Sequence, residues 1–142
     1  MIFTRLLKQI QTDEGLRLSP YLDTVSIPTI GYGTTWIAGE RVTMDTKDIT
    51  PATASSLLMA DVYAACIDAQ ELFACFNKLS YDRQEVLVNM AYNLGRAGLS
   101  KFVKFKEAVE AGEFNRAAME MIDSKWYTQV GSRAKRLVDR MA

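Results

Sequence analysis

The sequence predicts an α+β fold, with a small antiparallel sheet lobe near the N-terminus and a larger helical lobe after it. Apolar residues recur at helical spacing through most of the 142-residue chain, whereas short β-prone runs broken by glycine and proline are confined to residues 16–36. One long helical pattern separates these two regions. Because the chain has the length of one compact domain, we expect two lobes joined by a helix, with a cleft between them.

The chain is expected to open with a short amphipathic helix. Its apolar positions are Ile2, Phe3, Leu6, Leu7 and Ile10. Glu14 follows Ile10 by four residues, so its carboxyl group is expected on or beside the buried face. Gly15 is a stop signal for this helix. Residues 16–36 then predict a small hairpin or meander.

The second half of the chain reads as helical. Thr50 as cap and Pro51 at the first helical position predict a long helix over residues 51–76. Ser80 caps the next helix, which Gly95 and Gly98 are expected to break, and three more helical segments follow in residues 100–112, 113–127 and 132–141. We therefore expect a sheet lobe at about 14–50, a connecting helix at about 51–76 and a helical lobe at about 77–142, with helix 1–13 packing on the helical lobe.

Composition and charge narrow the class of protein. The hydrophobic share of 49% and charged share of 24% are typical of a soluble globular protein, and no stretch approaches the roughly 20 apolar residues needed to span a bilayer. We expect no stable membrane association and find no export signal. The formal net charge is zero, but residues 1–71 carry 5 basic and 9 acidic side chains (−4) and residues 72–142 carry 12 and 8 (+4). The basic C-terminal segment either attracts an anionic polymer or forms a solvated helix face.

The cysteines and the absence of histidine exclude several chemistries. Cys66 and Cys75 are nine residues apart on one predicted helix, too far for a disulfide, so we expect free thiols in a reducing cytosol. The chain contains no histidine, which excludes catalysis by an imidazole base and most zinc sites. No glycine-rich phosphate loop is present. We expect neither a metal nor a cofactor, and carboxylate chemistry remains.

Two carboxyl groups are candidates for acid and base roles. Glu14 ends an apolar helix face, where desolvation would raise its pKa, while Asp23 falls in a polar turn and is expected to stay ionised. Glycosidic bonds are usually hydrolysed by such a pair. Glutamate at a helix end and aspartate in a turn are also common structural features, so the residues alone leave both interpretations open.

The segment "DEGLRLSPYLDTVSIPTIGYG" resembles the active-site stretch of the phage lysozymes of glycoside hydrolase family twenty-four. That family places Glu, eight residues, Asp, five residues and Thr in this order, and Glu14, Asp23 and Thr29 fit without a gap. "NMAYNLG" resembles the cleft helix of the family and "SKWYTQVGSRAKR" its closing segment. Three separated matches make the resemblance extend over nearly the whole chain and imply a lysozyme-like fold.

The resemblance implies an endolysin muramidase that hydrolyses the β-1,4 bond between N-acetylmuramic acid and N-acetylglucosamine in peptidoglycan with inversion. Glu14 would protonate the leaving oxygen, and Asp23 with Thr29 would hold and activate the attacking water. Arg133 matches a family arginine that reaches toward the catalytic glutamate. Thr34 stands where familiar members have a histidine paired with an aspartate, so Asp61 is expected to lack that partner.

The resemblance also implies further substrate-binding residues. Gly31 and Gly33 are expected to leave backbone exposed along the cleft wall, where a sugar chain can approach. The remaining implied cleft residues are Thr35, Tyr92, Asn93, Phe105 and Glu120. Phe105 and Glu120 depart from the small or amide side chains usual there, and Tyr92 could equally be a core aromatic.

Two alternatives to hydrolysis remain. A cell-wall-binding module could retain the fold without turnover, and a lytic transglycosylase would cleave the same bond with only the acid. Asp23 and Thr29 favour an enzyme that uses water. We expect a monomer without nucleic-acid partners, held in the host cytoplasm until a separate membrane-hole protein, a holin, gives it access to peptidoglycan in the periplasm.

Overall fold

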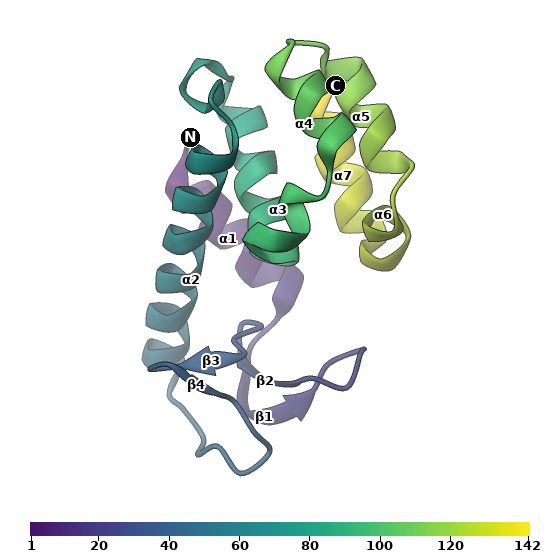
Figure 1. Ribbon diagram of the computed structural model, residues 1–142. Coiled ribbons are helices and arrows are strands. Elements are labelled where there is room, and N and C mark those ends of the chain that lie inside the picture. Colours follow the sequence, from purple (N-terminus) through teal and green to yellow (C-terminus); the bar gives the residue numbers. More distant parts are fainter. The chain divides into compact units, whose positions relative to one another are not determined.

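The computed structural model describes all 142 residues as seven α-helices, one 3-10 helix and four short strands. The order of elements confirms the α+β prediction (Figure 1). No helix is both long and apolar enough to cross a membrane. The elements are α1 (Phe3–Glu14), β1 (Arg17–Leu22), β2 (Pro28–Gly31), β3 (Trp36–Ile37), β4 (Glu40–Arg41), α2 (Pro51–Leu72), η1 (Phe76–Lys78), α3 (Tyr81–Ser100), α4 (Val103–Glu110), α5 (Phe114–Ile122), α6 (Lys125–Val130) and α7 (Ser132–Met141).

The chain divides into two compact units, one of residues 3–64 and one of residues 1–2 with 65–142. Helix α1 belongs to the same unit as the strands, and its expected packing on the helical lobe stays a prediction. Only the first two residues join the helical unit. There the Met1 ammonium group donates to Gln84 Oε1 at 2.7 Å. The polar partners of these two residues thus lie on α3, which explains their assignment.

Helix α1 begins and ends as its sequence pattern predicts. Leu6 and Ile10 are both 1% exposed, and their spacing of four places them on one face. Gly15 has φ +69°, and its N–H donates to the Gln11 carbonyl at 3.0 Å. A left-handed residue directly after the last turn is a typical helix stop, because glycine adopts it without a Cβ clash. Glu14 is therefore held at a defined helix end.

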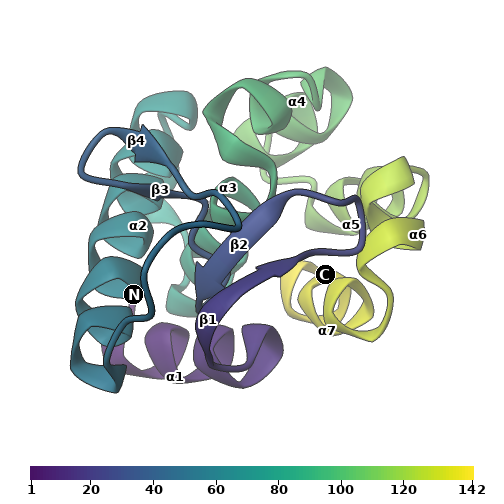
Figure 2. The same ribbon diagram turned by 90° about the horizontal axis from the view of Figure 1, so that it is seen from below.

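Two small antiparallel sheets follow α1. In the first, β1 pairs with β2 in the register Tyr21 with Thr29 and Leu22 with Pro28, and the ladder is irregular between Arg17 and Tyr21 (Figure 2). The second consists only of β3 and β4. The predicted hairpin is thus confirmed, and its connection from residue 23 to residue 27 carries Asp23.

The long helix α2 begins as predicted and ends earlier. Thr50 Oγ1 accepts the Thr53 N–H at 3.1 Å, which is the expected N-cap, and Pro51 occupies the first helical position. The helix ends at Leu72, whereas the pattern predicted residue 76. Beyond it the Phe76 N–H donates to the Phe73 carbonyl at 3.1 Å, so the backbone tightens to three-residue bonds and both rings are buried.

The two cysteines are free, as predicted, but they do not share a helix. Cys66 is buried within α2, and Cys75 lies after its end. Burial raises the pKa of the Cys75 thiol to about 11, with further contributions from a hydrogen bond to Glu110 and the charge of that carboxylate. A thiol with this pKa stays protonated at neutral pH and is a poor nucleophile.

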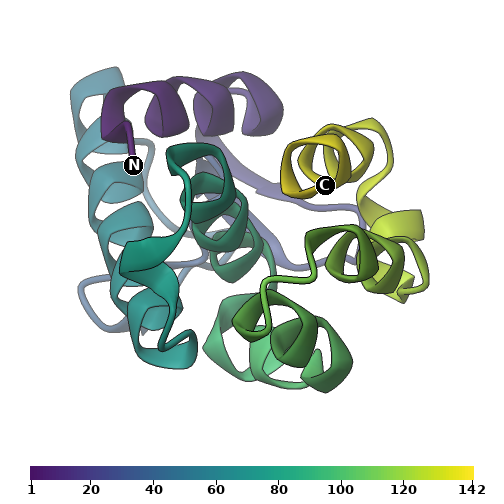
Figure 3. The same cartoon turned by 90° about the horizontal axis from the view of Figure 1, so that it is seen from above.

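The helical unit is built from α3 to α7, with α7 contacting α3, α5 and α6, and α4 packing on α5 (Figure 3). Ser80 caps α3 by accepting the Arg83 N–H at 3.3 Å, as predicted. Of the two expected breaks, Gly95 is a kink with φ 72° and ψ 167°. Gly98, by contrast, keeps a helical backbone. A Cβ there would meet Leu94 Cβ at 3.1 Å, so a small residue is needed at this position for packing and not for a turn.

Candidate active site

Asp23 is fixed by the backbone of its own turn. Its Oδ1 accepts hydrogen bonds from the N–H groups of Val25 at 2.9 Å and Ile27 at 2.8 Å. This is the arrangement by which aspartate commonly stabilises a turn. No hydrogen bond occupies the second oxygen, Oδ2. The carboxylate is therefore oriented by one oxygen while the other remains available to a water or a substrate.

Thr29 is linked to Asp23 through one peptide carbonyl. Its hydroxyl donates to the Ile27 carbonyl oxygen at 2.8 Å, and the same oxygen accepts the Asp23 N–H at 3.0 Å. Thr29 lies on β2 and is 3% exposed. Because its single proton is used in this bond, the hydroxyl oxygen can only accept a further hydrogen bond.

Glu14 and Asp23 both act on a third side chain, Tyr21. Burial raises the pKa of the Tyr21 phenol most, the negative charge of Glu14 raises it further, Arg17 lowers it and Asp23 raises it by the smallest amount. Glu14 is half-buried and ends α1, and Asp23 is the residue after β1. The structure thus brings both predicted catalytic carboxyl groups into the electrostatic surroundings of one phenol.

Tyr21 lies in the surroundings of both candidate carboxylates, and the sequence interpretation did not name it. The Arg17 guanidinium lies 4.7 Å from the centre of its ring, and Tyr21 is paired across the sheet with Thr29. The available signal was its position two residues before Asp23 at the end of a predicted strand, since alternate residues of an extended segment share a face. A tyrosine in a β-prone segment carries no chemical signal without the pairing register.

The two predicted cleft glycines have different environments. Gly31 was expected to expose its backbone, but it is buried, and a Cβ there would lie 3.4 Å from Ile49 Cδ1 and 3.5 Å from Ala54 Cβ. Its role is close packing at φ +67°, so this expectation was wrong. Gly33, at φ +82°, is half-buried, as is Thr35, whose carbonyl accepts the Val42 N–H at 2.8 Å.

Asp61 lacks a histidine partner, as expected, because position 34 is a threonine. The Thr34 hydroxyl donates to Asp61 Oδ2 at 3.4 Å, so a hydrogen bond stands in place of an ion pair. Burial raises the pKa of the Asp61 carboxyl, and the Thr34 hydrogen bond lowers it by less. Thr34 is 1% exposed, so this contact is part of the core between β2 and α2.

The other predicted site residues lie in the helical unit. Tyr92 and Asn93 are half-buried on α3, and Asn93 Nδ2 donates to Asn89 Oδ1 at 3.0 Å. Glu120 on α5 and Arg133 on α7 are half-buried. Phe105 is 1% exposed and packs edge-on against Phe73, which makes it a core residue first. The substrate-binding roles of all these residues remain predictions.

An α+β fold with one carboxylate at a helix end and a second in the following hairpin is consistent with a glycoside hydrolase, a class of enzyme that usually works with two carboxyl groups. The chain matches the sequence profile of the phage lysozyme family over residues 11–142. It therefore belongs to the phage lysozyme family.

Similar proteins place this membership in context. The endolysin from Escherichia coli O157:H7 phage FAHEc1 aligns with a TM-score of 0.79 and 28% identity, covering 96% of this chain and 90% of that one. Probable T4-type lysozyme 2 of Dictyostelium discoideum is 27% identical over 91% of this chain and 88% of its own length. The pre-baseplate central spike protein Gp5 of Enterobacteria phage T4 is 29% identical over 92% of this chain, but the match spans only 26% of that protein.

Proposed function

We propose that this lysozyme is an endolysin muramidase that hydrolyses the β-1,4 bond between N-acetylmuramic acid and N-acetylglucosamine with inversion at the anomeric carbon. The observation that carries the proposal is the hydrogen bonding of Asp23 and Thr29 through Ile27. It leaves two acceptor atoms, Asp23 Oδ2 and Thr29 Oγ1, at the same end of one hairpin. A water molecule has two protons to donate to such a pair.

In the proposed step, the water donates one proton to each acceptor and directs an oxygen lone pair at the anomeric carbon. Attack forms the new carbon–oxygen bond while Asp23 removes a proton from the water as general base. The glycosidic carbon–oxygen bond breaks, and the leaving oxygen takes a proton from Glu14. An inverting enzyme needs room for this water, with the carboxyl groups about 6.5–9.5 Å apart, whereas a retaining enzyme places them about 5–5.5 Å apart.

The product configuration tests the proposed step. A β-linked substrate should give the α-anomer as first product, which proton NMR can record before mutarotation. Initial β-anomer would show retention and remove the water-holding role of Asp23 and Thr29. An anhydro-sugar end would instead identify a lytic transglycosylase.

Two variants test the individual roles. Glu14→Gln retains the side-chain shape without the transferable proton, so hydrolysis should fall about 10²- to 10⁴-fold. Thr29→Ser should retain most activity because the accepting oxygen remains, whereas Thr29→Val should lose it. Equal activity of the serine and valine variants would contradict the role of Thr29. Full lysis activity of Glu14→Gln at equal folded fraction would exclude Glu14 as the acid.

We further propose that the protein acts as a monomer on periplasmic peptidoglycan after release from the host cytoplasm through a separate holin. The similarity to the endolysin of phage FAHEc1, at 28% identity over 96% of this chain, supports this proposal. Expression in cells with and without a holin, followed by culture turbidity, tests this. Lysis without a holin would contradict the proposal.

A further inference from the structure

The hairpin of β3 and β4 carries an exposed aromatic ring that the proposed catalytic step does not use. Trp36 on β3 is paired across the hairpin with Arg41 on β4. Trp36 is 51% exposed, whereas the only other tryptophan, Trp126, is 3% exposed. The hairpin lies beside the first turns of α2, within the unit of residues 3–64 (Figure 1 and Figure 2).

The turn of this hairpin is tight and strained. Ala38 and Gly39, the two residues between the strands, both have positive φ, at 51° and 80°. A two-residue turn of this kind matches the natural twist of the flanking strands. Glycine adopts the conformation freely, but an alanine side chain disfavours it. The hairpin that sets Trp36 opposite Arg41 is therefore kept in spite of local backbone strain.

Arg41 covers one face of the Trp36 ring. Its guanidinium carbon lies 5.0 Å from the ring centre, which is a cation–π contact. Because half of Trp36 is still exposed, the opposite ring face and the ring edges are open to solvent. Arg41 is exposed as well and makes no ion pair with the protein. Its N–H groups are thus available to an acceptor beside the ring.

The Trp36 ring lies on the side of the chain away from the predicted cleft. Thr34 and Trp36 are two residues apart in an extended segment, so their side chains point to the same side. The Thr34 hydroxyl donates to Asp61 of α2, which identifies this side as the one that faces α2. The predicted cleft residue Thr35 points to the other side. Trp36 therefore belongs to a different surface from the predicted substrate contacts.

The charge of the unit indicates which class of ligand fits. Residues 3–64 carry 5 basic and 7 acidic side chains (−2), so the unit lacks the positive surface that a nucleic acid or an anionic membrane requires. An uncharged N-acetylated sugar fits better. The C–H groups on one side of its pyranose ring can contact the electron-rich indole face, and its acetamido carbonyl can accept a hydrogen bond.

We propose that Trp36 and Arg41 form a second glycan-binding site, which takes an N-acetylglucosamine unit of a peptidoglycan strand outside the cleft. The pyranose ring stacks on the open face of Trp36, and the Arg41 guanidinium donates a hydrogen bond to the acetamido carbonyl. The inference rests on the proposed function, because that substrate is an N-acetylated glycan. Such a site holds the enzyme on the insoluble wall between successive cleavages.

The exposed tryptophan makes binding directly measurable. The probe is chitotetraose, a chain of β-1,4-linked N-acetylglucosamine units that lacks the muramic acid bond, titrated into the ¹⁵N-labelled protein. The chain has two indole N–H signals, and Trp36→Phe identifies the one from Trp36. We expect this signal to shift saturably, with reduced acrylamide quenching of Trp36 fluorescence. No shift up to about 10 mM chitotetraose, or a shift of the Trp126 signal alone, would overturn the proposal.

Variants test the two contacts on the wall itself. Co-sedimentation with purified sacculi, in a Glu14→Gln background that blocks turnover, measures binding. Trp36→Ala and Arg41→Ala should each weaken it about tenfold or more, as expected for truncation of a central aromatic or arginine contact. Tyr63→Ala and Lys47→Ala are the matched controls, since both side chains are exposed in the same unit and neither is part of the hairpin. Losses no larger than those of the controls would overturn the site.

A conservative variant separates the contact from the stability of the hairpin. Trp36→Phe keeps a ring for stacking and should retain most of the binding to sacculi, whereas Trp36→Ala should not. Thermal unfolding of each variant is compared with the parent. Equal losses for phenylalanine and alanine at equal stability would contradict stacking on the ring.

Hydrolysis separates this inference from the proposed function. If the parent protein hydrolyses peptidoglycan but chitotetraose leaves the Trp36 signal unchanged, the second site alone is rejected. If the Trp36 signal shifts saturably but no peptidoglycan is hydrolysed, the enzymatic function is rejected and a glycan-binding protein remains. A Trp36 shift caused by single-stranded DNA or anionic vesicles, with none caused by chitotetraose, would overturn the choice of ligand.

Discussion

The two oxygens of Asp23 have different tasks, so asparagine and alanine substitutions should separate stability from catalysis. Oδ1 accepts two backbone N–H groups at 2.9 and 2.8 Å, whereas Oδ2 is the proposed contact to water. Asparagine retains one acceptor oxygen for the turn but cannot act as a base. Alanine removes both functions.

The expected magnitudes follow from these contacts. A hydrogen bond contributes about 0.5–1.5 kcal/mol net, so losing both in Asp23→Ala should cost about 1–3 kcal/mol of unfolding free energy. Both N–H groups are exposed enough to bind water instead, which favours the lower half of that range. Asp23→Asn should cost less than about 1 kcal/mol. Hydrolysis should fall at least about 10²-fold in both variants, because both lose the base.

Urea unfolding gives the stability difference, and release of reducing ends from peptidoglycan gives the rate, compared at equal folded fraction. Asp13→Asn serves as a control for removal of a nearby carboxylate. If Asp23→Asn hydrolyses peptidoglycan within threefold of the parent, Asp23 is not the base. If asparagine and alanine destabilise equally, the turn does not depend on the Oδ1 hydrogen bonds.

Three further predictions concern the same unit. Ser26 has φ 63°, a backbone conformation that costs an L-residue about 1–2 kcal/mol. Ser26→Gly removes this strain but increases the entropy of the unfolded chain, so the net gain in unfolding free energy should be about 0.5–1 kcal/mol. A lower urea midpoint for this variant would contradict the prediction. Asp61→Asn should stabilise the protein slightly at pH 7, by less than about 1 kcal/mol because solvent screens the half-buried carboxylate. Burial raises the folded pKa of Asp61, so ionisation of this carboxyl costs stability as pH rises through that pKa. The stability gained by Asp61→Asn should therefore vanish in unfolding measurements well below pH 3.8. A gain that is the same at all pH values would refute the electrostatic cause. Glu14→Gln should lower the raised pKa of the Tyr21 phenol, measured by ultraviolet titration, more than Asp23→Asn does, and the reverse order would contradict the arrangement.

Local patterns were sufficient wherever neighbours in sequence decide the conformation. The Thr50 cap, the Ser80 cap and the stop at Gly15 each depend on atoms within four residues, and all three are confirmed. The candidate pair Glu14 and Asp23 was also predicted from local spacing, and its catalytic role stays a prediction. Family membership followed from the same segment with two others farther along the chain.

Predictions failed where a contact joins residues distant in sequence. The hydrogen bond from Thr34 to Asp61, which lies 27 residues later in the chain, was not predicted. Gly31 looked like exposed backbone, but Ala54 of α2 packs on it. The helix pattern continued to residue 76, yet the backbone tightens after Leu72, where the Phe73 ring packs edge-on against Phe105 of α4.

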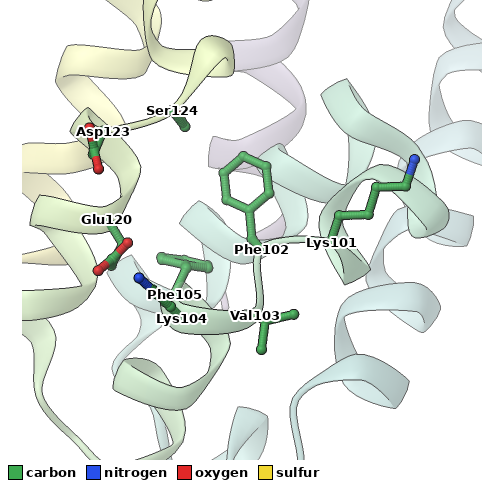
Figure 4. Close-up of a pocket in the computed structure, with 8 residues that line it drawn as sticks. All are labelled: Lys101, Phe102, Val103, Lys104, Phe105, Glu120, Asp123 and Ser124. Atoms are coloured by element: carbon green, nitrogen blue, oxygen red, sulfur yellow. The ribbon is translucent and has the colours of Figure 1, made fainter.

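The sequence by itself determined the fold class, the family and the residue types available for catalysis, because periodicity, capping and spacing are properties of neighbouring residues. Only the tertiary structure decided which atoms are free to react. The Thr29 hydroxyl donates its hydrogen bond to the Ile27 carbonyl, and the N–H groups of the turn donate to one oxygen of Asp23. The charges of Glu14 and Asp23 both raise the pKa of Tyr21. A cavity lined by residues 101–105, Glu120, Asp123 and Ser124 likewise depends on α4 packing against α5 (Figure 4). Hydrogen-bond direction and burial are set by partners in space, and sequence patterns do not record them.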